Sequence, residues 1–100
     1  MEIQNLDQFD SKNFKKYLGL YIQRRRKELN FSIEDLSKRT QINEKRLRSI
    51  ELGAKKTSAS EMEVLGAFLQ LDPCELVKIR RITQVQFIHD YLKAVHELKS

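Results

Sequence analysis

The chain has 100 residues, of which 40% are hydrophobic, and it carries a formal net charge of +5. This length makes one domain, and the hydrophobic content suffices for a modest core without disulfides or a metal. The lone Cys74 excludes an intramolecular disulfide, and no apolar run approaches the roughly 20 residues of a membrane span. Three Gly and one Pro leave little room for tight strand connections, so we expect an all-α, cytoplasmic protein without a signal peptide at its polar start.

The first ten residues combine three acidic side chains with three apolar ones at helical spacing, namely Ile3, Leu6 and Phe9. We expect an N-terminal arm over residues 1–10 that either docks through these apolar side chains or remains a mobile terminus. Ser11 is then placed to cap a first long helix, along which apolar residues recur at steps of three and four. This helix should stop near Asn30, a residue type that tolerates the left-handed conformation of a helix end.

Two short amphipathic helices separated by a tight turn follow between Ser32 and Gly53. Ser32 with Asp35 supplies an N-cap and an acidic first turn for the first of them. Five positions fit two crossed helices with one shared core better than a single helix: Leu36, Thr40, Ile42, Leu47 and Ile50. Asn43 is a good cap for a second helix over residues 44–52, which Gly53 can end in a left-handed conformation. This arrangement is a helix-turn-helix.

The chain resembles the lambda-repressor and Cro family of helix-turn-helix domains over residues 14–77. The resemblance rests on the sequence Arg-x-Lys-x-Leu-x-Phe-Ser that ends at Ser32 and on the Ile-Glu-x-Gly exit that ends at Gly53. It implies a five-helix domain that binds DNA. Three positions depart from the usual family pattern: Ile33 replaces a phosphate-contacting Gln, Ser37 replaces Ala, and Gln41 replaces Gly at the turn.

A run of four basic residues at positions 24–27 cannot face one direction on a helix, because successive residues rotate by about 100°. Arg26 lies four residues after Ile22 and three before Leu29, on the inner edge of the helix. In the resembled family the matching arginine pairs with the glutamate of the exit, here Glu51. We therefore expect a structural ion pair between Arg26 and Glu51, with the other three basic side chains exposed.

The charge distribution supports a nucleic-acid partner. Residues 12–56 hold 14 of the 19 Lys and Arg but only 5 of the 14 Asp and Glu, so this part carries +9 and the remainder −4. A basic block of this size on a small domain is typical of nucleic-acid binding, although basic helix faces also occur as ordinary solvated surface.

The second helix of the motif carries the binding chemistry that the resemblance implies. With Leu47 and Ile50 facing inward, four polar residues on the outer face are expected to read base edges in the major groove: Glu44, Lys45, Arg48 and Ser49. Four basic residues border this face and suit phosphate contacts: Lys38, Arg46, Lys55 and Lys56. A charged, solvated helix is the alternative interpretation.

Capping signals predict two more helices after the motif. Ser60 with Glu63 forms a capping-box pair for a fourth helix. Asp72 before Pro73 then predicts the start of a fifth, with Asp72 as the cap and Pro73 at the first helical position.

A separate C-terminal helix is predicted over residues 83–100, because Thr83 and Gln86 make another capping-box pair. The helix-turn-helix domain then spans residues 11–82. Apolar residues repeat along the C-terminal helix at steps of three, four and three: Val85, Ile88, Leu92 and Val95. A face of this kind must be buried, so we expect a dimerisation element, with packing onto the chain's own domain as the alternative.

The residue pattern favours a binding protein over an enzyme. Neither His89 nor His96 has a partner at metal-ligand spacing, and the sequence contains no Gly-rich phosphate loop and no activated Ser or Cys. We therefore expect no cofactor and no metal.

Two classes of function remain. The first is a bacterial or phage transcription regulator, a nucleoid-associated repressor that binds double-stranded operator DNA as a homodimer. An antitoxin is a variant of this class, in which the C-terminal seam binds a protein partner. The second is a protein-interaction module similar to the helix-turn-helix domain of RodZ-type cell-shape proteins, which contacts a filament instead of DNA. Ile33 and Gln41 suit this second class, whereas the basic second helix and the lack of a following membrane span favour the first.

Overall fold

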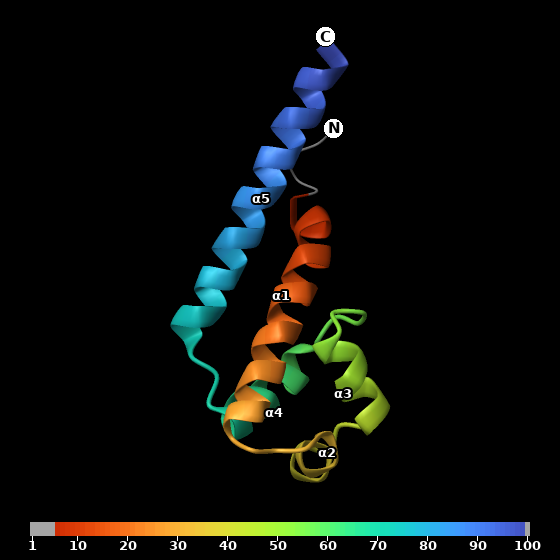
Figure 1. Ribbon diagram of the computed structural model, residues 1–100, viewed down its shortest axis with the longest axis vertical. Helices are drawn as coiled ribbons and strands as arrows, with labels where there is room; N and C mark the ends of the chain where they lie inside the picture. Colours follow the sequence, from red (N-terminus) through yellow and green to blue (C-terminus); the bar gives the residue numbers. More distant parts are fainter. Residues whose placement is uncertain (1–5, 100) are drawn as a thin grey trace.

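The computed structural model describes residues 6–99, and within them the side chains of residues 13–86 and 88–98. Residues 6–99 form five α-helices and no strand, which confirms the all-α class (Figure 1). The helices are α1 (Leu6–Glu28), α2 (Ile33–Thr40), α3 (Glu44–Glu51), α4 (Ala59–Leu69) and α5 (Pro73–Lys99). The backbone of residues 6–10 belongs to α1, and the docking of Ile3, Leu6 and Phe9 lies outside the described side chains.

The two longest helices, α1 and α5, run antiparallel beside each other, and the three short helices gather around the C-terminal part of α1 (Figure 1). The molecule is therefore elongated, with extents of 54 × 25 × 20 Å. In the part of the chain that the structure describes, no helix has the length and hydrophobicity needed to cross a membrane.

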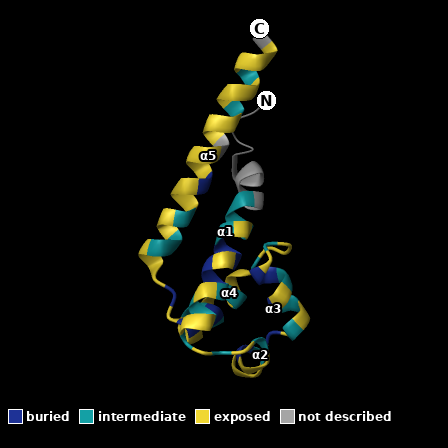
Figure 2. Cartoon of the chain, viewed as in Figure 1, coloured by how far each residue is buried: buried dark blue, intermediate teal, exposed yellow. Residues whose placement is uncertain are grey.

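The core lies where α1 meets the short helices and the start of α5, while most of the distal half of α5 is exposed (Figure 2). Six aliphatic side chains from four helices have at most 1% of their surface exposed: Ile22, Leu36, Leu47, Ile50, Leu65 and Leu69. Burial of each stabilises the fold by about 1.5–3 kcal/mol relative to an exposed position. The two helices of the motif are thus held on α1 and α4 by shared apolar contacts.

Helix caps follow the local sequence in the first half of the chain. Ser32 and Asp35 form a complete capping box at the start of α2, and Asn43 Oδ1 accepts a 2.8 Å hydrogen bond from the Lys45 amide at the start of α3. Asn30 and Gly53 adopt φ values of 60° and 75°, as expected for residues that end helices in a left-handed conformation.

The capping box of α4 differs from the predicted one. It is formed by Ser58 and Glu61, so α4 begins two residues earlier than a Ser60 and Glu63 box requires. Both serines precede a glutamate by three residues, and local spacing cannot choose between them. Glu61 is selected because it also binds Arg46 of α3, a contact between helices that Glu63 does not make.

The predicted separate C-terminal helix is wrong, because α5 runs without interruption from Pro73 to Lys99. Asp72 caps it as expected, its Oδ1 accepting a 2.9 Å hydrogen bond from the Cys74 amide. Thr83, predicted as a cap, lies inside the helix with its side chain buried, and its hydroxyl donates to the Arg80 carbonyl at 2.9 Å. The sequence after Pro73 contains no Gly or Pro to end the helix.

Candidate nucleic-acid interface

The second helix of the motif, α3, lies directly against α1. Leu47 and Ile50 of α3 are buried, and Gly19 of α1 faces the C-terminal end of α3. A Cβ atom at Gly19 would clash with the Ile50 carbonyl oxygen and lie 2.6 Å from that of Glu51. The missing side chain therefore permits the close approach that sets the position of α3.

The expected ion pair between Arg26 and Glu51 is present. Arg26 Nε and Nη2 donate to the two carboxylate oxygens of Glu51 at 2.6 and 3.0 Å, and Nη1 donates to the Phe31 carbonyl at 2.9 Å. The side chains are 11% and 5% exposed, so the pair is shielded from water. One guanidinium thus joins α1, α3 and the loop before α2.

One neighbouring basic residue departs from the expectation of exposure. Arg24 and Lys27 are exposed, but the Arg25 side chain is only 22% exposed, and its Nε donates to the Leu69 carbonyl at 3.2 Å. The reason is that Arg25 lies on the side of α1 that meets the C-terminal end of α4, where a helix has unpaired carbonyl groups.

A second arginine pair, which the sequence pattern does not predict, fixes the far side of α3. Arg46 Nε and Nη2 donate to the Glu61 oxygens at 2.9 and 2.8 Å, and Nη2 also donates to the Lys56 carbonyl at 2.8 Å. The hydrogen bonds from Arg46 lower the pKa of Glu61 to about 2, with smaller help from Ser58 and against the opposing effect of burial. Arg46 therefore ties α3 to α4 and to the loop between them.

The expected base-reading residues lie on one face of α3. Lys45 and Arg48 are exposed, and Glu44 and Ser49 are half-buried. The Ser49 hydroxyl donates to the Lys45 carbonyl at 3.1 Å, so its donor is occupied within the helix while its lone pairs stay available. The face thus presents two exposed cations beside one carboxylate.

The expected phosphate-binding lysines are all exposed, on α2 (Lys38) and in the loop after α3 (Lys55 and Lys56). This loop passes so close to α1 that a Cβ at Gly53 would lie 2.7 Å from the Lys16 Cα. The structure therefore brings the exposed Lys16 beside this loop. The sequence pattern does not single out Lys16, because the two positions are joined only by packing between α1 and the loop.

The turn of the motif accommodates its unusual residues through side-chain hydrogen bonds. The Ser37 hydroxyl donates to the Ile42 carbonyl at 2.6 Å, and the Thr40 hydroxyl donates to the Leu36 carbonyl at 2.7 Å. Gln41 takes the left-handed conformation, with φ of 63°, in place of a glycine. Ile33 packs against the core, so this position serves the fold.

The helix-turn-helix family model matches residues 22–76, more than half of the chain. These residues hold α2, α3 and α4 in full, with the C-terminal end of α1 and the first turn of α5. The chain belongs to the helix-turn-helix family. The match (HTH_3) is of the lambda-repressor-like type, which confirms the resemblance found in the sequence. A comparison of this helix-turn-helix protein with curated proteins gives no match.

A solved structure with a similar fold is that of the clp gene regulator ClgR from Corynebacterium glutamicum. The two share 16% sequence identity and superpose with a TM-score of 0.62, over 86% of this helix-turn-helix chain and 93% of the ClgR chain. The likeness therefore extends beyond the motif to the arrangement of the surrounding helices.

Proposed function

We propose that this protein is a transcription regulator of the repressor type that binds double-stranded DNA as a homodimer, with α3 in the major groove. The observation that carries the proposal is that the outer face of α3 is exposed and basic, while the inner face of this helix is packed firmly against the domain. Gly19 and the ion pair of Arg26 with Glu51 hold the helix, while Lys45 and Arg48 stay free to reach base edges. Family membership and a fold shared with a protein described as a gene regulator support the same function.

Each side chain of the outer face has a distinct role in this proposal. Lys45 and Arg48 donate to guanine O6 and N7, and Glu44 accepts from cytosine N4. Ser49 keeps acceptor capacity and contacts a base donor. The N-terminal residues of recognition helices reach base edges, which favours Glu44 and Lys45 as the closest readers.

The phosphate contacts come from the lysines that surround α3. We assign them to Lys38, Lys55 and Lys56, and we add Lys16 because it lies beside the same loop. Arg46 takes a different role from the one expected, since Glu61 and the Lys56 carbonyl hold its guanidinium. It positions the loop that carries two of the lysines.

The dimer forms through α5. Val85, Ile88 and Leu92 are exposed on it, and Val95 is half-buried. Exposed apolar residues at a regular helical spacing are typical of an interface between helices. A dimer presents two copies of α3 related by two-fold symmetry, which matches the two half-sites of a palindromic operator.

A titration with duplex DNA at two salt concentrations tests the function. Phosphate contacts release counterions, so the logarithm of the association constant should fall with the logarithm of salt, with a slope of about −0.9 per phosphate contacted. If no duplex binds better than micromolar at low salt, even after selection from a randomised pool, the regulator function is wrong.

A further inference from the structure

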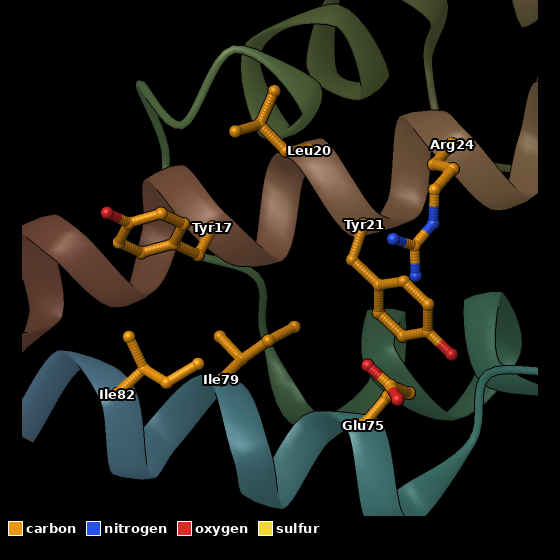
Figure 3. A pocket seen from close by; sticks show the side chains of 7 residues that line it. All are labelled: Tyr17, Leu20, Tyr21, Arg24, Glu75, Ile79 and Ile82. Atoms are coloured by element: carbon orange, nitrogen blue, oxygen red, sulfur yellow. The ribbon is translucent and has the colours of Figure 1, made fainter.

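A groove with apolar walls lies between α1 and α5 (Figure 3). It has a volume of about 270 Å³, and its walls are formed by Tyr17 and Leu20 from α1 and by Ile79 and Ile82 from α5. Leu20 and Ile82 are 49% and 57% exposed, although both are large aliphatic side chains. The chain itself therefore leaves these walls partly uncovered.

One end of the groove is charged, because the antiparallel helices bring Arg24 of α1 and Glu75 of α5 to the same end (Figure 3). These two described side chains do not pair with each other. Arg24 Nε lies 3.5 Å from Glu28 Oε1, and Glu75 Oε1 lies 3.3 Å from Lys78 Nζ, each within its own helix. Such solvent-accessible pairs between neighbours on a helix are weak, so a ligand can replace them at little cost. The groove end thus presents one cation and one carboxylate to a bound molecule.

The other charged groups near this end are already occupied. A polar hollow adjoins the groove, and three further charged side chains line it: Arg25, Glu28 and Asp72. Arg25 and Glu28 bond to each other at 3.4 Å, and Asp72 Oδ1 accepts a hydrogen bond from the Cys74 amide at the start of α5. Arg24 and Glu75 are therefore the charged groups most available to a ligand.

Tyr21 supplies a buried hydroxyl at the junction of the groove and the polar hollow, since it lines both. The residue is only 6% exposed, and its oxygen accepts a 2.9 Å hydrogen bond from the Asp72 amide. Among the described residues, its own proton has no acceptor within hydrogen-bond distance. A buried donor without an acceptor is unfavourable, so this hydroxyl suits a carboxylate oxygen of a ligand.

We propose that the groove binds a free α-amino acid with an apolar side chain. The ligand carboxylate accepts hydrogen bonds from Arg24 and Tyr21, and its ammonium group donates to Glu75. The apolar side chain of the ligand lies between the walls of the groove, away from the charged end. A volume of about 270 Å³ is smaller than the roughly 300–1,000 Å³ of sites for drug-sized molecules, which also indicates a small ligand.

The ligand site and the base of α3 use different faces of α1. Tyr17, Tyr21 and Arg24 follow one another at steps of four and three, which places them on one face of the helix. Gly19 and Arg26, which hold α3, each lie two residues further along, about 200° around the helix from Tyr17 and Arg24. The inference therefore goes beyond the proposed DNA binding, and it is tested on the full-length protein without DNA.

A nuclear magnetic resonance titration of the wild type tests the class of ligand. L-leucine or L-phenylalanine should bind with a dissociation constant of about 1 mM or tighter and shift amide signals of residues 17–24 and 75–82. Two leucine analogues, 4-methylpentanoate without the ammonium group and 3-methylbutylamine without the carboxylate, should bind about tenfold more weakly or worse. L-serine should also bind weakly, because it lacks the apolar side chain.

Two results of this titration would overturn the proposal. The first is that neither L-leucine nor L-phenylalanine binds at concentrations up to about 10 mM. The second is that either leucine analogue binds as tightly as leucine, because a site for a zwitterion must use both charged groups of the ligand.

Substitutions at the two charged residues test their separate roles. Glu75→Gln should weaken leucine binding by about tenfold or more but bind 4-methylpentanoate at least as well as the wild type does. Arg24→Gln should also weaken leucine binding, with no loss of affinity for 3-methylbutylamine. Each variant removes one charge, so only the ligand group that meets this charge is affected.

The matched controls are Glu63→Gln and Lys27→Gln, which remove exposed charges outside the groove, on α4 and α1. Both should bind leucine like the wild type. If Glu75→Gln and Arg24→Gln also bind leucine like these controls, with circular dichroism showing all four variants folded, the proposal is wrong.

Discussion

Arg26 of α1 and Glu51 of α3 are joined by two parallel hydrogen bonds, and their side chains are among the least exposed charged groups of the helix-turn-helix. Because both are shielded from water, loss of either leaves the other as an unpaired charge. Arg26→Ala or Glu51→Ala should therefore lower the free energy of unfolding by about 3–5 kcal/mol in urea denaturation. The double variant Arg26→Met with Glu51→Leu should lose much less, since no charge remains buried.

Arg24 provides the matched control for this pair. It forms an exposed ion pair with Glu28 one helical turn away, with the two side chains 62% and 50% exposed. Arg24→Ala should change the free energy of unfolding by about 0.5 kcal/mol or less. Equal effects of Arg24→Ala and Arg26→Ala would show that the buried pair does not stabilise the fold.

Two glycines should respond in opposite ways to the same substitution. Gly19→Ala places a methyl group against the backbone of α3 and should destabilise the fold by about 1–3 kcal/mol or more, because backbone cannot move aside as a side chain can. Gly66 lies within α4, where a Cβ would meet no atom within 4 Å outside its own helix backbone and chain neighbours, so Gly66→Ala should stabilise by about 0.5–1 kcal/mol. Thermal midpoints of the two variants test this difference in sign.

The pair of Arg46 and Glu61 should make stability depend on pH in the acid range. The pKa of Glu61 falls from an ordinary value of 4.5 to about 2 in the folded protein. Its ionised form therefore stabilises the fold fully above pH 4.5, and this contribution disappears as the pH falls toward 2. Urea midpoints measured between about pH 5 and 2 should fall less steeply for Glu61→Gln than for the wild type.

Glu63 is the control for this titration because it is an exposed glutamate of the same helix. The variant Glu63→Gln should keep the slope of the wild type over the same pH range. An unchanged slope for Glu61→Gln would mean that its carboxylate is not stabilised by Arg46 in solution.

Lys45 and Lys56 should differ in how they affect DNA binding. Lys45→Ala should weaken binding to the cognate operator by about 1–3 kcal/mol and binding to random duplex much less, because a base contact is specific to sequence. Lys56→Ala should weaken both alike and reduce the magnitude of the salt slope by about one, as expected for a phosphate contact. If Lys45→Ala weakens binding to the cognate operator and to random duplex equally, Lys45 does not contact a base.

Local chemistry determined much of this structure in advance. The caps Ser32, Asn43 and Asp72 lie where the sequence places them, as do the left-handed ends at Asn30 and Gly53. A cap joins groups within about three residues of each other, so its energy depends on neighbours in the chain. The apolar positions of the motif were predictable for a related reason, because the period of a helix decides which side chains share a face.

Tertiary structure decided what local rules leave open. Ser58 caps α4 in place of Ser60 because Glu61 meets Arg46, 15 residues away in the chain. Likewise, the packing of α5 makes Thr83 a buried helical residue where its spacing to Gln86 suggested a cap.

The two surfaces of functional interest also depend on tertiary contacts. Lys16 lies beside the loop after α3 because that loop passes close to α1, and Leu20 and Ile82 line one groove because α1 and α5 lie side by side. Sequence spacing specifies the faces of each helix but not which faces oppose one another. That choice is made by the shared core, in which apolar side chains from α1, α2, α3, α4 and the start of α5 pack together.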